Sequence, residues 1–158
     1  MIREANPDDA EGICTVLRES ISKLCSSDHG NDPAKMDSWL ENKTTENCRL
    51  WLGSVASKTF VAVKLAAVVG VIMVSHDGHI YLCYVKPDVK GQGFGSQMLI
   101  AAEAWLKSIG CNSLMADSTA TALGFYKHHG YVACGEPELE EGMLSYPLKK
   151  TLIYNHSS

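Results

Sequence analysis

The sequence predicts a single α+β domain, a sheet flanked by helices, and three observations point to this class. Residues 10–24 and 98–109 carry apolar side chains at a spacing near 3.6, which is typical of amphipathic helices. Residues 60–85 form runs rich in β-branched side chains, which is typical of adjacent strands. The 158 residues, 46% of them apolar, suffice for one buried core. We assign residues 1–152 to the domain and 153–158 to a C-terminal tail.

The first part of the chain is predicted to hold a short strand and two or three helices. The strand covers residues 2–5. Asn6–Pro7 then supplies an N-cap and a proline at the first helical position, and this helix is expected to end near Cys25. After a polar loop over residues 26–31, Asp32–Pro33 repeats the signal and opens a second helix through about Leu40. A third short helix is expected after Thr45.

The middle of the chain is predicted to be an antiparallel meander. Its strands cover residues 60–65, 68–74 and 79–85, and Asp77–Gly78 is a favourable hairpin turn between the last two. The turn at residues 65–67 contains no Gly, Asn or Asp, so the strand boundaries there are less well defined by the sequence.

The last part alternates strands and helices. A helix through Ile109 is closed by Gly110, a common C-terminal residue. A strand over residues 113–116 and a helix over 119–129 follow, and Gly130 closes the latter. Strands over 131–134 and 143–148 are joined by an acidic connection, residues 135–142.

Composition excludes several classes of function. The net charge of −4 gives no basic face for nucleic acid, and no apolar run reaches the ~20 residues that span a bilayer. The polar N-terminus is unlike a secretory signal, so we expect a cytoplasmic protein. The six cysteines form no C-x-x-C pair, which predicts reduced, mostly buried thiols and no structural metal.

One stretch organises the chain: residues 85–96, V-K-P-D-V-K-G-Q-G-F-G-S. Its glycines, Gly91, Gly93 and Gly95, lie between a predicted strand and a predicted helix. Glycine allows positive φ and close approach of a ligand to the backbone. The free N–H groups and the dipole at a helix start suit a phosphate or pyrophosphate.

Three interpretations of this stretch compete on residues alone. No Lys-Ser/Thr follows the last glycine, which argues against a Walker A loop. The G-Q-G-F-G spacing and the preceding meander differ from a dinucleotide fingerprint. A glycine-rich turn without a ligand remains open.

The context of the stretch resembles the GCN5-related N-acetyltransferase (GNAT) superfamily. That family's pyrophosphate loop reads Arg/Gln-x-x-G-x-Gly/Ala, and here the three places are held by Lys90, Gly93 and Gly95. A second family pattern, N-x-x-A-x-x-x-Y-x-x-x-G-[FY], is matched at Thr119, Ala122, Tyr126, Gly130 and Tyr131. Lys90 and Thr119 are departures from the usual residues. The resemblance implies a mixed, mostly antiparallel sheet of about six to seven strands with flanking helices.

The resemblance also implies that acetyl-CoA is the co-substrate and that no metal is needed. The backbone of Cys83, Tyr84 and Val85 would bond the pantetheine arm, much as an added strand does. The diphosphate would lie on the loop residues Lys90, Gly91, Gln92, Gly93, Phe94, Gly95 and Ser96, and Thr119 would lie beside the pantetheine.

Catalysis in the family is a direct attack of a primary amine on the thioester. In many relatives the tyrosine at the place of Tyr126 protonates the departing thiolate. The base is not identified: Asp28 and His29 would border the acceptor pocket, His79 and Tyr81 lie on the central strand, and a water chain is the remaining alternative. A covalent intermediate on Cys83 is not expected, since a strand cysteine is usually a small hydrophobe.

The acidic connection bears on the acceptor. Its carboxylates are Glu136, Glu138, Glu140 and Glu141, of which we take Glu138 and Glu140 as acceptor contacts. They would attract a small cationic amine, such as a polyamine, an aminoglycoside or an amino acid, although a merely solvated charge run is the alternative. Family members are often dimers, which leaves a homodimer open. A non-catalytic module that binds or senses acyl-CoA is the alternative function.

Overall fold

The computed structural model describes residues 1–140 and 142–152, so Glu141 and the predicted tail, residues 153–158, lie outside the described residues. The elements, in chain order, are β1 (Ile2–Glu4), α1 (Ala10–Leu24), α2 (Ser26–His29), α3 (Pro33–Leu40), α4 (Thr45–Leu52), β2 (Ser57–Lys64), β3 (Ala67–Ser75), β4 (His79–Val85), α5 (Phe94–Ser108), β5 (Ser113–Ser118), α6 (Leu123–His128), β6 (Val132–Ala133), β7 (Glu138–Glu140) and β8 (Met143–Thr151). Short 3-10 turns at Pro7–Asp9 and Pro87–Val89 precede α1 and the glycine loop.

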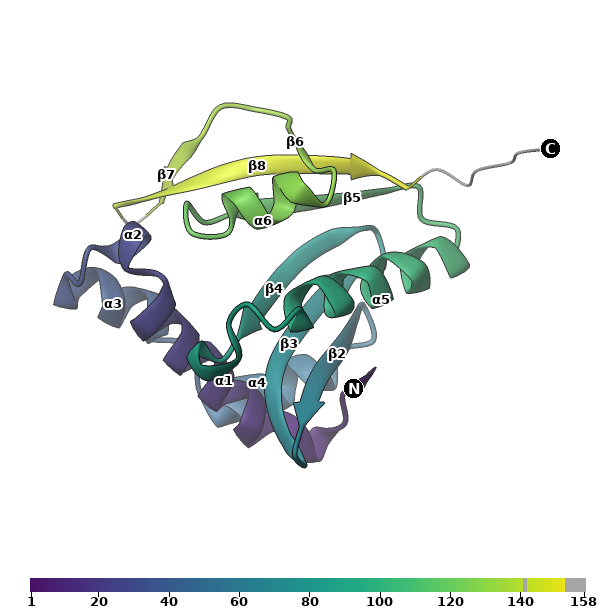
Figure 1. Cartoon of the computed structure of the whole chain (residues 1–158), viewed down its shortest axis with the longest axis horizontal. Helices are drawn as coiled ribbons and strands as arrows, with labels where there is room; N and C mark the ends of the chain where they lie inside the picture. The colour runs from purple at the N-terminus through teal and green to yellow at the C-terminus, as the bar shows by residue number, and fades with distance from the viewer. Residues whose placement is uncertain (141, 153–158) are drawn as a thin grey trace.

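The strands form one sheet in the order β1-β2-β3-β4-β5-β8-β6, and β7 pairs with β8 outside this path. Neighbouring strands are antiparallel except β4 and β5, which are parallel. Helices cover both faces of the first four strands (Figure 1). The predicted α+β class, with a mostly antiparallel sheet flanked by helices, is therefore confirmed. The described residues contain eight strands rather than six or seven.

Two cores lie on opposite faces of β3. Val71 faces a cluster with Val16 and Leu17 of α1, whereas the next residue, Ile72, faces a cluster with Met98 and Leu106 of α5. A strand buried on both faces reads as a continuous apolar run, as V-V-G-V-I-M-V does. The central strands are thus held between α1 and α5, and this rigid layer supports β4.

The helix starts follow the predicted capping signals. The Asn6 side chain accepts a hydrogen bond from the Asp8 N–H (2.9 Å), and the Asp9 carboxylate accepts one from the Asn6 N–H (2.8 Å). Arg3 also contacts Asp9 at 2.8 Å, and its hydrogen bond lowers the pKa of that carboxyl. Asp32 caps α3 through the Ala34 N–H. Such caps satisfy donors that a helix leaves unpaired.

Three local predictions were wrong. The expected polar loop over residues 26–31 contains the one-turn helix α2. Helix α6 begins at Leu123 rather than Thr119, because residues 119–122 form a turn in which Thr119 Oγ1 accepts from the Ala122 N–H (3.1 Å). The acidic connection contains strand β7, which pairs with β8 from Glu138–Ser145 to Glu140–Met143.

The two hairpin turns of the meander differ in residue type. The predicted Asp77–Gly78 turn is present, with Gly78 at φ 93°. The β2–β3 turn has Leu65 and Ala66 at φ 50° and 65°. Positive φ at both central residues matches the twist of a two-residue hairpin. This turn therefore forms without the residues that usually signal it.

A buried polar cluster joins α5 to the C-terminal strands. Glu103 accepts a hydrogen bond from the Tyr131 hydroxyl (2.8 Å) and contacts Lys150 Nζ at 3.0 Å. Glu103 is only 8% exposed, so its charge requires these partners. The cluster therefore holds β8 and the residue before β6 against α5.

The described part of the chain contains no helix long and apolar enough to cross a membrane. The six cysteines are free thiols. Mostly buried thiols were predicted: Cys14, Cys25 and Cys48 are buried, Cys83 and Cys111 are half-buried, and Cys134 is exposed.

Candidate active site

The site begins where β4 and β5 separate. Their recorded pairing consists of two pairs, His79–Met115 and Ile80–Ala116. The β3–β4 register pairs Met73 with Leu82 and Val74 with Ile80, so Tyr81 is an extra residue in β4. Such a β-bulge bends a strand and ends its pairing on one side. Beyond it, β4 diverges from β5, and α6 lies over the gap (Figure 1).

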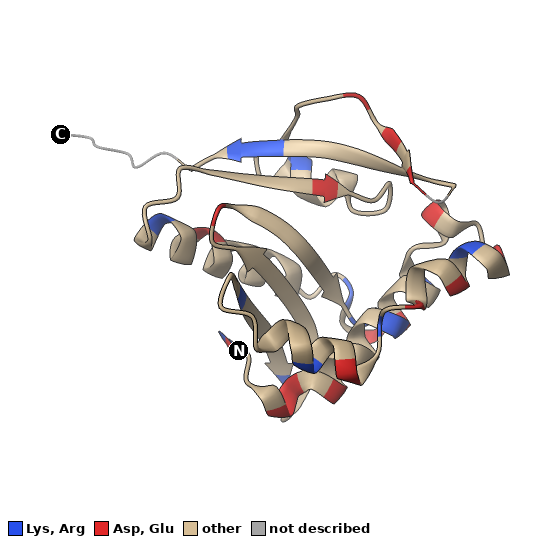
Figure 2. Ribbon diagram, turned by 180° about the vertical axis from the view of Figure 1, so that it is seen from behind, with Lys and Arg blue, Asp and Glu red and all other residues tan. Residues whose placement is uncertain are grey.

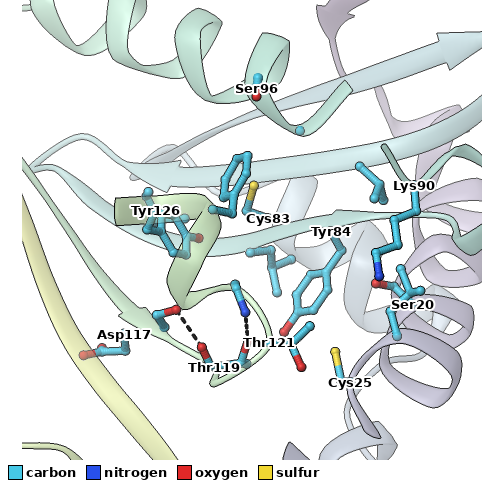
Figure 3. A pocket seen from close by; sticks show the side chains of 18 of the residues that line it. Ser20, Cys25, Cys83, Tyr84, Lys90, Ser96, Asp117, Thr119, Thr121 and Tyr126 are labelled. Atoms are coloured by element: carbon cyan, nitrogen blue, oxygen red, sulfur yellow. Dashed lines mark hydrogen bonds between the residues drawn. The ribbon is translucent and has the colours of Figure 1, made fainter. Parts of the chain in front are cut away.

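A cavity of about 430 Å³ lies where β4 and β5 separate. Its walls come from the end of α1, from β4, from the glycine loop, from the end of β5 and from α6. The lining residues are Ser20, Leu24, Cys25, Ile80, Tyr81, Leu82, Cys83, Tyr84, Val85, Lys90, Gly91, Gly93, Gly95, Ser96, Asp117, Ser118, Thr119, Thr121, Ala122, Phe125 and Tyr126. Figure 3 shows the side chains of 18 of them. The volume is in the range of small-molecule and cofactor sites.

The glycine loop forms one end of this cavity. Gly91 and Gly93 have φ of 83° and 87°, a conformation that side chains other than glycine rarely adopt. The Gln97 N–H bonds the Gly93 carbonyl (3.1 Å), so the preceding N–H groups in the first turn of α5 have no partner within the helix. A Cβ on Gly95 would lie 3.3 Å from the Phe125 ring. The loop therefore presents backbone donors and helix dipole to an anion.

Two predicted loop contacts lie outside the cavity lining. The Gln92 side chain accepts a hydrogen bond from Lys64 of β2 (2.8 Å), and its backbone N–H bonds the Val89 carbonyl. Phe94 packs against the core on the α5 face. The side chains of Gln92 and Phe94 thus support the loop from behind, while Lys90, Gly91, Gly93, Gly95 and Ser96 line it.

Ser96 and Thr119 line the cavity, but each hydroxyl has a partner. Ser96 Oγ lies 2.8 Å from His129 Nε2, which joins the start of α5 to the end of α6. Burial and the neighbouring His128 lower the pKa of His129, which favours its neutral form. Thr119 Oγ1 accepts from the Ala122 N–H, as above, and this bond orients the turn before α6.

Tyr126 lies at the centre of the divergence, between α6 and β4 (Figure 3). It is 5% exposed, and its ring packs edge-on against Phe125 and Tyr131. Burial raises the pKa of the Tyr126 phenol well above 10, with smaller contributions from Cys83 and Tyr84. The phenol is therefore protonated at neutral pH and can donate a proton or a hydrogen bond into the cavity.

The two cysteines of the cavity are poor nucleophiles. Burial raises the pKa of Cys83 to about 12 and that of Cys25 to about 12. Because the thiolate is the reactive form, both thiols are unreactive at neutral pH. This agrees with the expectation that no covalent intermediate forms on Cys83.

A second cavity of about 220 Å³ adjoins the first. It is lined by Asp28, Trp39, Tyr84, Asp117, Ser118, Thr119, Glu140, Met143, Leu144 and Ser145. Tyr84, Asp117, Ser118 and Thr119 line both cavities, so the two meet there. In Figure 2 the acidic positions on β5, β7 and α2 lie around one end of the C-terminal strands. Carboxylates and aromatic rings together suit a cation.

The predicted acceptor residues separate into two groups. Asp28 and Glu140 line the second cavity, but the Asp28 carboxylate already accepts from the Ala120 N–H (2.6 Å) and from Thr121. Glu138 lies on exposed β7, outside the lining of both cavities. His29 is fully buried, with Nε2 2.8 Å from the Ile21 carbonyl and Nδ1 accepting from the Asn31 N–H. His29 therefore has no free ring nitrogen for an acceptor, which corrects its predicted contact.

His79 and Tyr81 lie at the junction with β5. Their rings stack with centroids 5.4 Å apart, and His79 Nε2 lies 3.2 Å from Asp117 Oδ2. Among residues 1–140 and 142–152, no cluster of three or more His, Cys, Asp or Glu side chains is suited to hold a metal ion.

Several lining residues were not predicted from the sequence. Cys25 between α1 and α2, Trp39 of α3 and Asp117 of β5 are brought together by tertiary packing. The sequence around Asp117 gives one local indication, the alternation in Leu114–Ser118. It places Asp117 on the face of β5 that its buried neighbours Ala116 and Ser118 do not occupy. Alternation identifies a face of a strand, but it does not say what the face is near.

Comparison with known families and structures gives a consistent result. A family model described as "Acetyltransferase (GNAT) domain" matches residues 19–152. The chain is 37% identical over 57 residues to an aminoglycoside N(6′)-acetyltransferase type 1 from Stenotrophomonas maltophilia, over 36% of this chain and 36% of that protein. It is 32% identical over 76 residues to the peptidyl-lysine N-acetyltransferase YjaB from Salmonella typhimurium, over 48% of this chain and 50% of that protein. The chain thus spans half or less of the length of these curated relatives.

Solved structures share the whole fold. A GCN5-related N-acetyltransferase from Rhodopseudomonas palustris matches with a TM-score of 0.85 at 22% identity, over 96% of this chain and 94% of that chain. The PaiA N-acetyltransferase from Thermoplasma acidophilum, solved in complex with coenzyme A, matches with a TM-score of 0.79 at 18% identity, over 96% of this chain and 98% of that chain.

Proposed function

The chain belongs to the GNAT acetyltransferase family, and we propose that it transfers an acetyl group from acetyl-CoA to a primary amine of a small cationic molecule. The observation that carries this proposal is the position of Tyr126. Its protonated phenol lies in the cavity at the β4–β5 divergence, between the glycine loop and the second cavity. A sensor that only bound acyl-CoA would not need an acid there.

The first cavity fits coenzyme A on features of this chain alone. The edge of β4 beyond Ile80 is free of β5, so the backbone of Cys83, Tyr84 and Val85 can receive an amide-bearing chain like an added strand. The loop from Lys90 to Ser96 presents N–H groups, the helix dipole and one cation to a diphosphate. These residues would hold the cofactor, and the bound thioester would supply the acetyl group.

Tyr126 serves as the general acid in this proposal. When the amine attacks the thioester carbonyl, the C–S bond breaks and the sulfur needs a proton. The phenol of Tyr126 donates it, and solvent or the acceptor nitrogen then reprotonates the phenol. The raised pKa of Tyr126 keeps the phenol protonated at every physiological pH.

The second cavity receives the acceptor. Asp117 and Glu140 provide negative charge, and the rings of Trp39 and Tyr84 provide faces on which an alkyl ammonium can rest. One relative acts on aminoglycosides and another on peptidyl-lysine. The small volume and exposed acidic rim favour a slender, cationic amine arm over a bulky neutral substrate.

An amine panel tests the proposal. The chain is mixed with acetyl-CoA and with spermidine, kanamycin, a lysine-containing peptide or a neutral amino sugar derivative, and free thiol is measured together with acetylated product. We expect product with a cationic small molecule, with spermidine or kanamycin preferred over the peptide. Tight binding of coenzyme A without product from any amine would favour the non-catalytic module instead.

A further inference from the structure

The contact between His79 and Asp117 lies beside the second cavity and is not used by the mechanism above. Resting on the proposed function, we propose that this pair activates the acceptor amine. Asp117 holds the ammonium group where the two cavities meet, and His79 takes its proton and releases it to solvent.

Position supports the role of Asp117. It is one of four residues that line both cavities, and it is the only carboxylate among those four. A reacting amine must reach from the acceptor cavity toward the cofactor cavity, so it passes this junction. A carboxylate there can hold an ammonium group and orient it.

Contacts with solvent support the role of His79. Its Nε2 lies 3.2 Å from Asp117 Oδ2, and the two side chains are 36% and 56% exposed. The imidazole thus touches Asp117 on one side and water on the other. Stacking on the Tyr81 ring, with 28° between the planes, restricts its orientation. An imidazole has two ring nitrogens, so it can accept a proton at one and release a proton at the other.

The strand geometry explains why the two side chains meet. Ile80 pairs with Ala116 in the parallel β4–β5 ladder, and both are buried on the α5 face. The neighbours of these residues, His79 and Asp117, therefore project to the opposite face. Because the pairing ends at Ile80, this is the last point at which β4 and β5 side chains lie adjacent before the cavity opens.

The proton balance of the step is simple. The bound ammonium has three N–H bonds and no free electron pair, with a pKa near ~10 for an alkyl amine. Loss of one proton to His79, directly or through a water on Asp117, leaves a neutral amine whose lone pair can form the C–N bond. The protonated imidazole then releases its proton to water. The second amine proton, lost after C–N bond formation, balances the one that Tyr126 gives to sulfur.

Other charged and titratable groups face the pair. Asp28, Glu140 and Tyr84 share the second cavity with Asp117, and Tyr81 stacks on His79. On β8, Lys149 is the register partner of Met115, which places it on the Asp117 face of the sheet. Any pH dependence assigned to His79 must therefore be measured against variants that leave these groups unchanged.

The test compares pH profiles of His79→Gln and Asp117→Asn with two matched controls. The controls are His76→Gln, in the exposed β3–β4 turn, and Asp37→Asn, exposed on α3. We expect Asp117→Asn to lower kcat/KM for the cationic acceptor by roughly 100-fold, the lower end of the usual range for proton-transfer groups, and His79→Gln to lower it by roughly 10-fold at neutral pH, less than that range because water on Asp117 can replace the imidazole. Coenzyme A affinity should not change.

The profile itself separates proton transfer from a structural role. The deficit of His79→Gln in kcat/KM should shrink as pH approaches ~10, where the amine is already neutral. Both controls should keep the wild-type profile. If His79→Gln or Asp117→Asn loses coenzyme A binding, His79→Asn and Asp117→Glu replace them.

The two possible failures can be told apart. If the wild type acetylates an amine but the His79 and Asp117 variants keep its rate and profile, the inference is overturned and the proposed function stands. If the wild type acetylates no amine, the proposed function fails and the inference fails with it.

Discussion

The two cavities are built in different ways. The first combines one continuous segment, from Ile80 through the glycine loop to Ser96 at the start of α5, with residues from α1, β5 and α6. The second is formed by side chains from five elements, α2, α3, β5, β7 and β8, together with Tyr84 of β4. A backbone cradle can be recognised from glycine spacing and a strand-to-helix transition. A side-chain cavity can change its specificity through single substitutions without disturbing the first cavity.

The largest expected effect concerns Tyr126, which lines the first cavity. Tyr126→Phe removes the proposed acid but keeps the ring that packs on Phe125 and Tyr131. We expect kcat to fall by roughly 100-fold, with unchanged affinity for coenzyme A, in steady-state thiol-release and calorimetric measurements. Because burial raises the pKa of this phenol, the wild-type kcat should show no loss from tyrosine ionisation below about pH 10. Unchanged turnover in the variant would remove Tyr126 from the mechanism.

The backbone cradle is tested with two glycines of similar conformation. Gly93 and Gly110 have φ of 87° and 84°, and a Cβ would meet no close contact at Gly110. Valine at either site costs about 1–2 kcal/mol of backbone strain. Gly93→Val should also raise KM for acetyl-CoA by roughly 10-fold, because the loop must move, whereas Gly110→Val should lower stability alone. Equal KM values in the two variants would contradict a backbone-built anion site.

A third prediction concerns Asp28 of the second cavity, which bonds the turn that carries Thr121 of the first cavity. Its carboxylate holds the Ala120–Thr121 turn against α2. Asp28→Asn should lower the free energy of unfolding by about 1–2 kcal/mol, as expected for loss of charge-assisted hydrogen bonds. Asp32→Asn is the control, since asparagine caps a helix as well as aspartate does. If denaturant unfolding gave the same midpoint for both variants, Asp28 would not hold this turn.

The smallest expected effect concerns the acidic strand of the second cavity. Glu140 lines it and Glu138, two residues earlier in β7, does not. Glu140→Gln should raise KM for a cationic acceptor by about two- to five-fold and weaken its dependence on salt, a size typical of exposed charge interactions. Glu138→Gln should leave both quantities near the wild-type values. Equal KM values and equal salt dependence in the two variants would mean that Glu140 makes no specific contact with the acceptor and that β7 contributes only its overall negative charge.

The same contrast explains what could be predicted from the sequence. The position of Gly91, Gly93 and Gly95 in the cavity lining could be predicted because they lie between a predicted strand and a predicted helix, whereas Tyr126 was named from the family pattern over residues 119–131. Trp39 and Asp117 were not, since nothing local in α3 or β5 indicates that they share a cavity. Helix α2 has one turn, which is too short for a periodic pattern.

Two further differences have physical causes in packing. Strand β7 contains two glutamates and forms through its pairing with β8 rather than through strand propensity. His29 was expected near a substrate because it lies between the first two predicted helices, in a segment that borders the acceptor pocket in relatives. In the fold, α2 turns its ring inward onto the Ile21 carbonyl.

In the proposed mechanism, acetyl groups pass directly from the first cavity to an amine in the second. The most direct measurement uses acetyl-CoA labelled in its acetyl group, with the label followed by mass spectrometry into amine and protein. We expect one labelled amide for each thiol released, and no label on Cys83 or Cys25 when acetyl-CoA is added alone. Label on either cysteine, or thiol release without amide, would contradict direct transfer.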